Sequence, residues 1–350
     1  MRERNEGEKS PVPDVQGRLE TAQIYNDEWR GWPILPFHRQ HPIRGSFLDP
    51  RAHDQLGAVY HDGVDIAVRD DRPDRGAPAG RTHRVHAIEG GRVTRATPHG
   101  VRGLVDIAHF RYEHVDALVR VGELVQPGQQ IAWAWNGDWH VHLGELLDLP
   151  DGRRAFVNPL RPGGKLAPYL DTARPAVEEV RFYTPAAPPW GRRPVNVARY
   201  PQAGRRLNKA RLSGTIDVRA RIADPQSFIG WFKDKPWLAA PHHPYRVGVS
   251  LAQHGTGRVL HDQDVFRSEQ MLELPAGQHY APGTEQNLSA GGCIRRHGSL
   301  RCPGVYWFRL FPRPYLNTRQ LPNGRYRISI RVWDAAGNSR VDNTDITVRN

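Results

Sequence analysis

Apolar and polar residues alternate with a period of two in several short stretches of the chain, and this alternation limits the possible folds more than any other feature. It is clearest in the C-terminal segment GRYRISIRVWDAAGNSRVDNTDITVRN (324–350). Successive side chains of a strand point to opposite faces, so this segment predicts two strands joined by the turn DAAGN. Glycine and proline, 34 and 30 of the 350 residues, separate the other stretches. The spacing is typical of an all-β protein rather than of a helical bundle.

The chain divides into four parts by composition. Residues 1–28 are polar and without periodicity, which predicts a disordered leader. Short β signals separated by glycine and proline fill residues 29–165, and the proline-rich stretch 166–180 predicts a linker. Period-two segments return in residues 181–350, where a β-sandwich is expected. Within the first β-rich part, VGELVQPGQQIA (121–132) predicts a hairpin, with Gly122 and Gly128 at its turns.

The charge balance favours anionic partners. Lys and Arg number 49 against 37 Asp and Glu, a net charge of +12, which suits nucleic acid, acidic lipids or the phosphate-rich polymers of a bacterial envelope. The basic residues are dispersed and form no nucleic-acid motif, so no nucleic-acid partner is predicted and anionic wall polymers are the better match. No apolar run reaches membrane-spanning length, so no transmembrane segment is predicted. The N-terminus lacks the apolar core of a signal peptide, and the route of export stays open.

Two further features have more than one interpretation. Cys293 and Cys302 would close a small loop if paired, which suits an oxidising compartment, and two free thiols fit the sequence nearly as well. An aromatic group in the 228–314 stretch could stack on sugars, but a packed core or a contact between domains is the favoured interpretation. Its members are Phe228, Trp231, Phe232 and Trp237.

Two histidine motifs carry the functional signal. YHDGVDIAV contains His61 and Asp65, and WHVHLGE contains His140 and His142. Residues two or four apart on a strand project from the same side, so each run could present two side chains to one ion. Imidazole and carboxylate are suitable zinc ligands, and a catalytic zinc site uses three protein ligands. The spacing alone is weak evidence, because 17 histidines produce such pairs by chance, and solvated or core histidines are the alternative.

Six segments in order give these motifs a context. HPIRGSFLDPR is followed by HDGVDIAV, VHAIEGGRV, VDIAHFRYEHV, VRVGELVQPGQQIA and HVHLGE between Pro42 and Glu145. In this order the segments resemble the M23 family of metallopeptidases, the lysostaphin-like, LytM-type enzymes that cut peptide bonds in bacterial peptidoglycan. The resemblance implies an antiparallel β-sheet peptidase domain over 29–165. The part that follows resembles an immunoglobulin-like module, most clearly in YRISIRVWDAAGN.

The resemblance implies a role for each motif residue. His61, Asp65 and His142 occupy the positions of the Zn²⁺ ligands, and His114 and His140 those of the catalytic pair beside the attacking water. The implied activity is a zinc endopeptidase acting on cell-wall cross-links or stem peptides, in the cell envelope or secreted. A non-enzymatic envelope regulator and a wall-binding protein are the alternatives. The bond that is cut and the oligomeric state stay open.

Other residues near the motifs have less specific interpretations. His109 fits a residue near the metal or a structural histidine equally well, and Tyr112 fits an oxyanion-side residue or a core aromatic. Glu145 is expected to be structural, and Arg51 to be solvated rather than a groove residue. His83 and His86 are expected at the surface. The chain departs from the family pattern in AWNGDWHVH, in the short tip between VDIAH and YEH, and in an apparent insertion, RDDRPDRGAPAGRTHR, so substrate preference is not implied.

Overall fold

The computed structural model describes residues 31–37, 39–53, 57–97, 102–185, 204–227, 240–273, 276–284, 294–296, 299–301, 304–312 and 315–350. The predicted leader, both cysteines and the aromatic group of the 228–314 stretch lie outside these residues. The described part is all-β, as the alternation predicted. Besides strands it contains the 3-10 turns η5 (Ala276–Gln278) and η7 (Thr318–Gln320). No helix in this part is long and apolar enough to cross a membrane.

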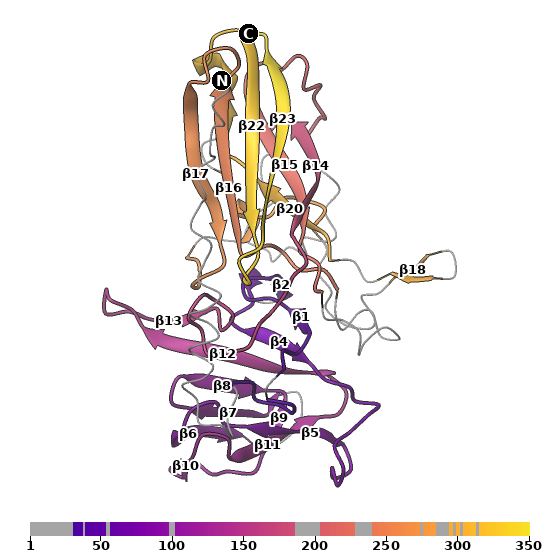
Figure 1. Ribbon diagram of the computed structural model, residues 1–350, viewed down its shortest axis with the longest axis vertical. Helices are drawn as coiled ribbons and strands as arrows, with labels where there is room; N and C mark the ends of the chain where they lie inside the picture. Colours follow the sequence, from indigo (N-terminus) through magenta and orange to yellow (C-terminus); the bar gives the residue numbers. More distant parts are fainter. Residues whose placement is uncertain are drawn as a thin grey trace, which may run out of the picture.

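A large antiparallel sheet carries Asp65, His140 and His142 on its strands. Figure 1 shows this sheet below the C-terminal strands. It is built in the order β1 (Ile43–Gly45), β4 (Val64–Ala67), β12 (His140–Asp148), β8 (Phe110–Glu113), β7 (Leu104–Ile107), β6 (Gly91–Thr97) and β10 (Leu124–Val125). β13 (Arg154–Val157) also pairs with β12, and β2 (Pro50–His53) pairs with β3 (Gly57–Tyr60). We call the large sheet that runs from β1 to β10 the site sheet.

A three-stranded sheet lies against the site sheet. It consists of β5 (Arg81–His86), β11 (Gln130–Trp135) and β9 (Val115–Ala117). Val85 and Ile131 from this sheet share one apolar core with Val105 and Tyr112 of the site sheet. The hairpin predicted for 121–132 is wrong, because β10 pairs with β6 while β11 pairs with β5 and β9. The glycine turns are present, with φ of 90° at Gly122 and 78° at Gly128, but the strands they flank pair with distant ones.

The C-terminal part is a β-sandwich. One of its sheets holds β14 (Ala176–Tyr183), β15 (Thr215–Ala223), β20 (Tyr306–Arg309) and β21 (Leu316–Asn317). The other follows the order β17 (Val259–Arg267), β16 (Arg246–Gln253), β22 (Gly324–Trp333) and β23 (Ser339–Val348). β22 and β23 are paired along their whole length around the DAAGN turn, as predicted. β14 begins at Ala176, inside the stretch expected to be a linker.

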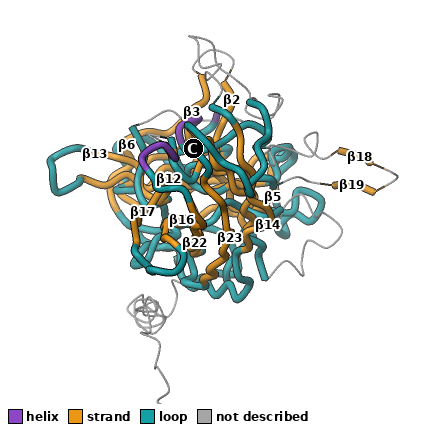
Figure 2. The backbone as a smooth tube through the Cα atoms, turned by 90° about the horizontal axis from the view of Figure 1, so that it is seen from above, coloured by secondary structure: helices purple, strands orange, loops and turns teal. Residues whose placement is uncertain are grey.

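The sandwich stands on the site sheet, and both contribute to one continuous core (Figure 1). Phe47, which follows β1, is fully buried in this core together with Tyr280 and Phe308 of the sandwich. Figure 2 shows the molecule from above, with the short hairpin β18 (Ile294–Arg296) and β19 (Ser299–Arg301) standing away from the rest of the chain.

Candidate metal centre

Strand β12 presents two histidines to the same side of the site sheet. His140 and His142 alternate with Val141 and Leu143, whose side chains are fully buried in the core. β12 pairs with β4 so that His142 is directly opposite Asp65. Oδ1 of Asp65 lies 3.2 Å from Nδ1 of His142 and 3.4 Å from Nε2 of His140. The period-two interpretation of the HxH motif is therefore confirmed.

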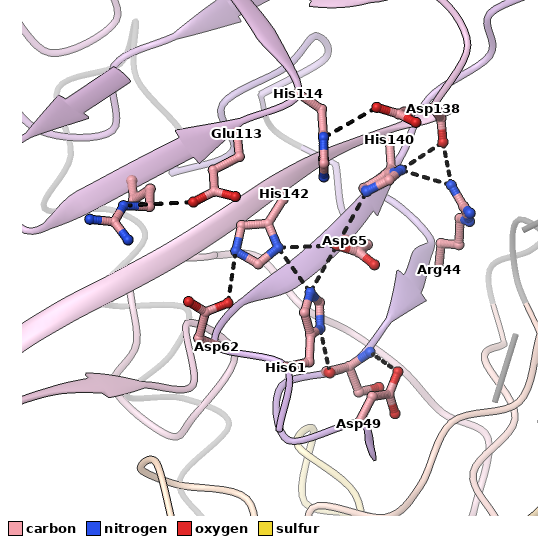
Figure 3. A network of polar contacts seen from close by, with 12 residues as sticks. Arg44, Asp49, His61, Asp62, Asp65, Glu113, His114, Asp138, His140 and His142 are labelled. Atoms are coloured by element: carbon pink, nitrogen blue, oxygen red, sulfur yellow. Dashed lines mark hydrogen bonds and ion pairs between the residues drawn. The ribbon is translucent and has the colours of Figure 1, made fainter. Parts of the chain in front are cut away.

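His61 reaches this group from outside the strands. The sequence predicted His61 and Asp65 on one strand, but β3 ends at Tyr60 and β4 begins at Val64, so His61 lies in the connection. Its Nε2 atom is 3.0 Å from Oδ1 of Asp65 and 2.8 Å from Nδ1 of His142 (Figure 3). His61 therefore meets Asp65 because the connection between β3 and β4 folds back, and not because the two residues share one face of a strand.

His61, Asp65 and His142 form a group that could hold a metal ion. One ligand atom from each lies within 4.8 Å of the others, and all three residues are buried. Zinc–ligand bonds of about 2.0–2.1 Å in a tetrahedron separate neighbouring ligand atoms by about 3.3 Å. The observed separations of 2.8, 3.0 and 3.2 Å need to open by only a few tenths of an ångström.

The orientation of the two rings also fits a cation. Nδ1 of His61 donates to the Ser46 carbonyl oxygen at 2.8 Å, so the lone pair of the neutral ring is on Nε2, which faces Asp65. Nδ1 of His142 faces the same carboxylate, and its Nε2 atom lies 3.5 Å from Oδ1 of Asp62. One nitrogen of each ring thus points toward the Asp65 carboxylate. This is how outer carboxylates and carbonyls orient the histidine ligands of a metal.

Burial lowers the pKa of His142, but the Asp65 carboxylate outweighs burial and raises that pKa above its ordinary value. The same negative charge attracts a divalent cation. A close backbone approach makes room for the ring, because a Cβ on Gly63 would lie 2.4 Å from the Leu143 carbonyl oxygen and 2.6 Å from Nε2 of His142. The glycine of the HDGVD motif therefore has a steric role that spacing alone did not reveal.

His114 and His140 lie beside this group. Their ring centroids are 4.6 Å apart, and the ring of His114 is 6.3 Å from that of His142. His114 joins β8 to β9 with a φ of 62°, and Trp139, just before His140, has a φ of 58°. Such conformations cost roughly 1–3 kcal/mol in a non-glycine residue and gather at functional sites. All five motif histidines and aspartates are thus brought together.

The two histidines have different surroundings. Nδ1 of His114 lies 3.2 Å from Oδ2 of Asp138, and a fifth of its side chain is exposed. His140 is buried. Its Nδ1 atom lies 2.7 Å from a guanidinium nitrogen of Arg44 and 2.6 Å from the Asp138 carbonyl oxygen, to which Arg44 also donates (Figure 3). Burial lowers the pKa of His140 to about 3, Asp65 opposes this, and Arg44 and His114 add to it.

Arg44 and Asp138 were not identified from the sequence. Asp138 belongs to AWNGDWHVH, the stretch that departs from the family pattern, so the departure itself was the available signal. Arg44 belongs to HPIRGS and carries no local signal. Asp70, in the segment taken for an insertion, accepts hydrogen bonds from the backbone amides of Gly137 and Trp139 at 2.7 and 3.1 Å and so holds the loop before His140.

The remaining candidates lie elsewhere. His109 pairs with Glu89 at 2.8 Å. It lies just before β8, where its carbonyl oxygen accepts from the Leu146 amide, whereas His142 pairs with the other end of β8. Tyr112 is a core aromatic whose hydroxyl accepts a hydrogen bond from the Ile88 amide at 2.7 Å. Glu145 is buried and pairs with Arg161, a structural role as expected.

Three further residues were expected at the surface or in solvent. The surface placement of His83 and His86 is wrong, because both are half-buried in β5. The Arg51 side chain lies outside the described part.

Comparison with known proteins gives a single short match. A solved structure of Helicobacter pylori Csd3 is similar over 32% of this chain and 30% of that chain, at 25% identity and a TM-score of 0.23. The chain thus spans less than a third of the Csd3 chain. No family model and no curated protein matches it. At this TM-score the match carries no weight for function, which we infer instead from the geometry of the site and the sequence motifs.

Proposed function

We propose that the chain is a zinc-dependent endopeptidase that hydrolyses peptide bonds of bacterial peptidoglycan in the cell envelope or outside the cell. The observation that carries the proposal is the convergence of two imidazole nitrogens and one carboxylate oxygen within 3.2 Å, with two further histidines beside them. Structural zinc sites are closed by four protein ligands, whereas three ligands are typical of catalytic ones. The peptidoglycan substrate is supported by the six ordered segments shared with the M23 family.

In this proposal His61, Asp65 and His142 hold the zinc ion. When bound, zinc lowers the pKa of a water molecule toward neutrality and polarises the scissile carbonyl group. The separations of the ligand atoms and the ring nitrogens that face Asp65 support this assignment. Asp65 supplies the anionic ligand and faces both histidines of β12.

We assign the proton transfers to His114. Its contact with the Asp138 carboxylate fixes the ring and stabilises the imidazolium that forms when Nε2 accepts a proton. Its partial exposure lets that proton leave toward the amine product.

His140 has the opposite character. Burial and the neighbouring Arg44 guanidinium lower its pKa, which favours a neutral ring that is a weaker base than His114. We assign it, with the Arg44 charge behind it, to stabilising the negative charge that develops on the carbonyl oxygen.

The proposal is tested by digesting purified cross-linked peptidoglycan with the protein, with and without a zinc chelator, and identifying released fragments by mass spectrometry. Defined peptide fragments that disappear with chelator and return with added zinc are expected, and their masses identify the bond. Zinc bound to the protein without release from several wall types would contradict the proposal and favour the regulator or wall-binding alternatives.

A further inference from the structure

The metal-binding group depends on a four-residue turn that follows β1. His61 makes three hydrogen bonds to this turn: Nδ1 to the Ser46 carbonyl oxygen, its amide to the Asp49 carbonyl oxygen at 2.9 Å, and its carbonyl oxygen from the Leu48 amide at 2.8 Å. Asp49 closes the turn by accepting from the Ser46 amide at 2.9 Å (Figure 3). The position of His61 and the nitrogen that it presents are therefore fixed by this turn.

The turn is held from its other side by the sandwich. The Phe47 carbonyl oxygen accepts from His243 and from Ser268, both at 2.9 Å. The Leu48 carbonyl oxygen accepts from the Tyr280 hydroxyl at 3.1 Å, and Oδ1 of Asp49 accepts from the Tyr306 hydroxyl at 3.0 Å. All four donors are at least 95% buried, so these bonds are shielded from competing water.

The turn needs such support because its backbone is strained. Leu48 has a φ of 69°, in the left-handed region that a branched side chain rarely adopts. This conformation persists only where surrounding contacts over-determine it. Within the described residues, the sandwich supplies side-chain donors to three consecutive members of the turn, Phe47 to Asp49.

We propose that the C-terminal sandwich is an outer layer of the metal site, and that Tyr306 is a positioning residue acting through Asp49 and the turn on the ligand His61. A hydrogen bond from Tyr306 to Asp49 and three bonds from the turn to His61 form a continuous connection from β20 to the ligand group. The inference rests on the proposed function insofar as His61 is a metal ligand. It assigns the sandwich a role inside the site, distinct from binding the cell wall.

The test compares Zn²⁺ affinities of the full-length chain and its variants, measured by competition with a chromophoric chelator. Tyr306→Phe removes one hydroxyl and keeps the ring. Loss of a direct outer partner of a ligand typically costs 10–100-fold in metal affinity, and Tyr306 reaches His61 only through Asp49 and the turn, so we expect zinc binding to weaken by about tenfold, the lower end of this range. The matched control is Tyr326→Phe, since Tyr326 is equally buried in the sandwich but donates to the Pro322 carbonyl oxygen. Its zinc affinity is expected to match that of the unmodified chain.

A second substitution guards against a folding defect. If Tyr306→Phe does not give the circular-dichroism spectrum and cooperative unfolding of the unmodified chain, Ser268→Ala removes a smaller donor to the same turn and is expected to weaken zinc binding. Unchanged affinity in the folded variants would overturn the inference. Zinc binding without peptidoglycan cleavage would remove the proposed function and leave the inference intact, whereas absence of zinc binding in the unmodified chain would remove both.

Discussion

At the scale of single residues, His114 and His140 have the same side chain but differ in chemistry because their neighbours differ. His114 is partly exposed and faces a carboxylate, whereas His140 is buried beside a guanidinium. Neither belongs to the three-residue group that could hold a metal. Their roles can therefore be separated from metal binding by substitution.

Replacing His114 by alanine is expected to abolish cleavage while zinc stays bound. Removal of a general acid–base group costs typically 10²–10⁴-fold in rate, and we expect a loss in this range for peptide release from peptidoglycan. Zinc content is measured in the same samples by atomic absorption.

The control for this substitution is His109→Ala, because His109 pairs with Glu89 away from the site. It is expected to retain both zinc and activity. Loss of zinc in His114→Ala would mean that His114 is a ligand, and full activity would remove it from the mechanism.

At the scale of secondary-structure elements, β12 is the strand on which the site depends. It carries His140 and His142 near its start and is fixed beyond them by Glu145, which is 1% exposed. Two nitrogens of Arg161 lie 2.5 and 2.9 Å from the Glu145 carboxylate oxygens. This bidentate pair connects β12 to the segment that follows β13.

Arg161→Met is expected to destabilise the fold by about 3 kcal/mol, because it leaves the Glu145 carboxylate buried without its partner. The free energy of unfolding is measured in urea, with zinc affinity measured in parallel. Arg153→Met is the control, since Arg153 pairs with exposed carboxylates and is expected to change stability by less than about 1 kcal/mol. Equal effects of the two substitutions would show that the Glu145 pair contributes no more than a surface pair.

The elements also show how far sequence patterns determine the structure. Period two identified β22 and β23 because one face of each strand is buried. It also identified β12, where polar His140 and His142 alternate with apolar Val141 and Leu143 although both faces are buried. It misplaced His61, whose position is determined by the turn at Ser46–Asp49 and not by strand alternation. It also could not give the partners of β10 and β11, since pairing between strands far apart in sequence depends on the whole sheet. Domain boundaries stay predictions.

In the site, too, local patterns identified some residues and could not identify those whose roles depend on distant contacts. The five motif residues were identified from local spacing together with the order of six segments. Arg44 and Asp138 were missed because their roles arise from contacts across the sheet: Arg44 lies 96 residues from His140, and Asp138 reaches His114 across a strand connection.

At the scale of the whole molecule, ionisable groups are buried where the sandwich meets the rest of the chain. Asp171, Asp224 and Asp334 are all more than 90% buried, and Asp224 bonds through its backbone to His242, which donates to the Ile43 carbonyl oxygen of β1. Burial, with the charges of Asp334 and Asp171, raises the pKa of Asp224 well above its usual range. Burial likewise raises the pKa of Asp334 to about 7.

These shifts predict that the fold loses stability as the pH rises. Well below the ordinary pKa of 3.8 both carboxyl groups are protonated in the folded and the unfolded chain, and the folded chain keeps its protons at higher pH than the unfolded one. Between the ordinary pKa of 3.8 and the raised value of about 7, the folded state therefore binds more protons, and its stability falls as they are withdrawn.

Asp224→Asn is expected to remove part of this dependence, because asparagine has the shape of the protonated acid and cannot ionise. We expect the stability advantage of the variant over the unmodified chain to be larger at pH 8 than at pH 4.5, because the acid is forced to ionise in the fold as the pH rises through its raised pKa. Urea unfolding at the two pH values measures the difference. Groups of opposite sign, such as His41, whose pKa burial lowers to about 4, affect both proteins equally and cancel in the comparison.

The control for this prediction is Asp148→Asn, since the Asp148 side chain is 82% exposed. Its replacement is expected to change the free energy of unfolding by the same small amount at both pH values. A variant at position 224 that is destabilised equally at pH 4.5 and pH 8 would show that the carboxylate is ionised and stabilising in the fold. In that case the junction would hold a compensating positive group. With the expected result, the buried acids lower the stability of the fold in alkaline conditions, because they must then ionise between the sandwich and the rest of the chain.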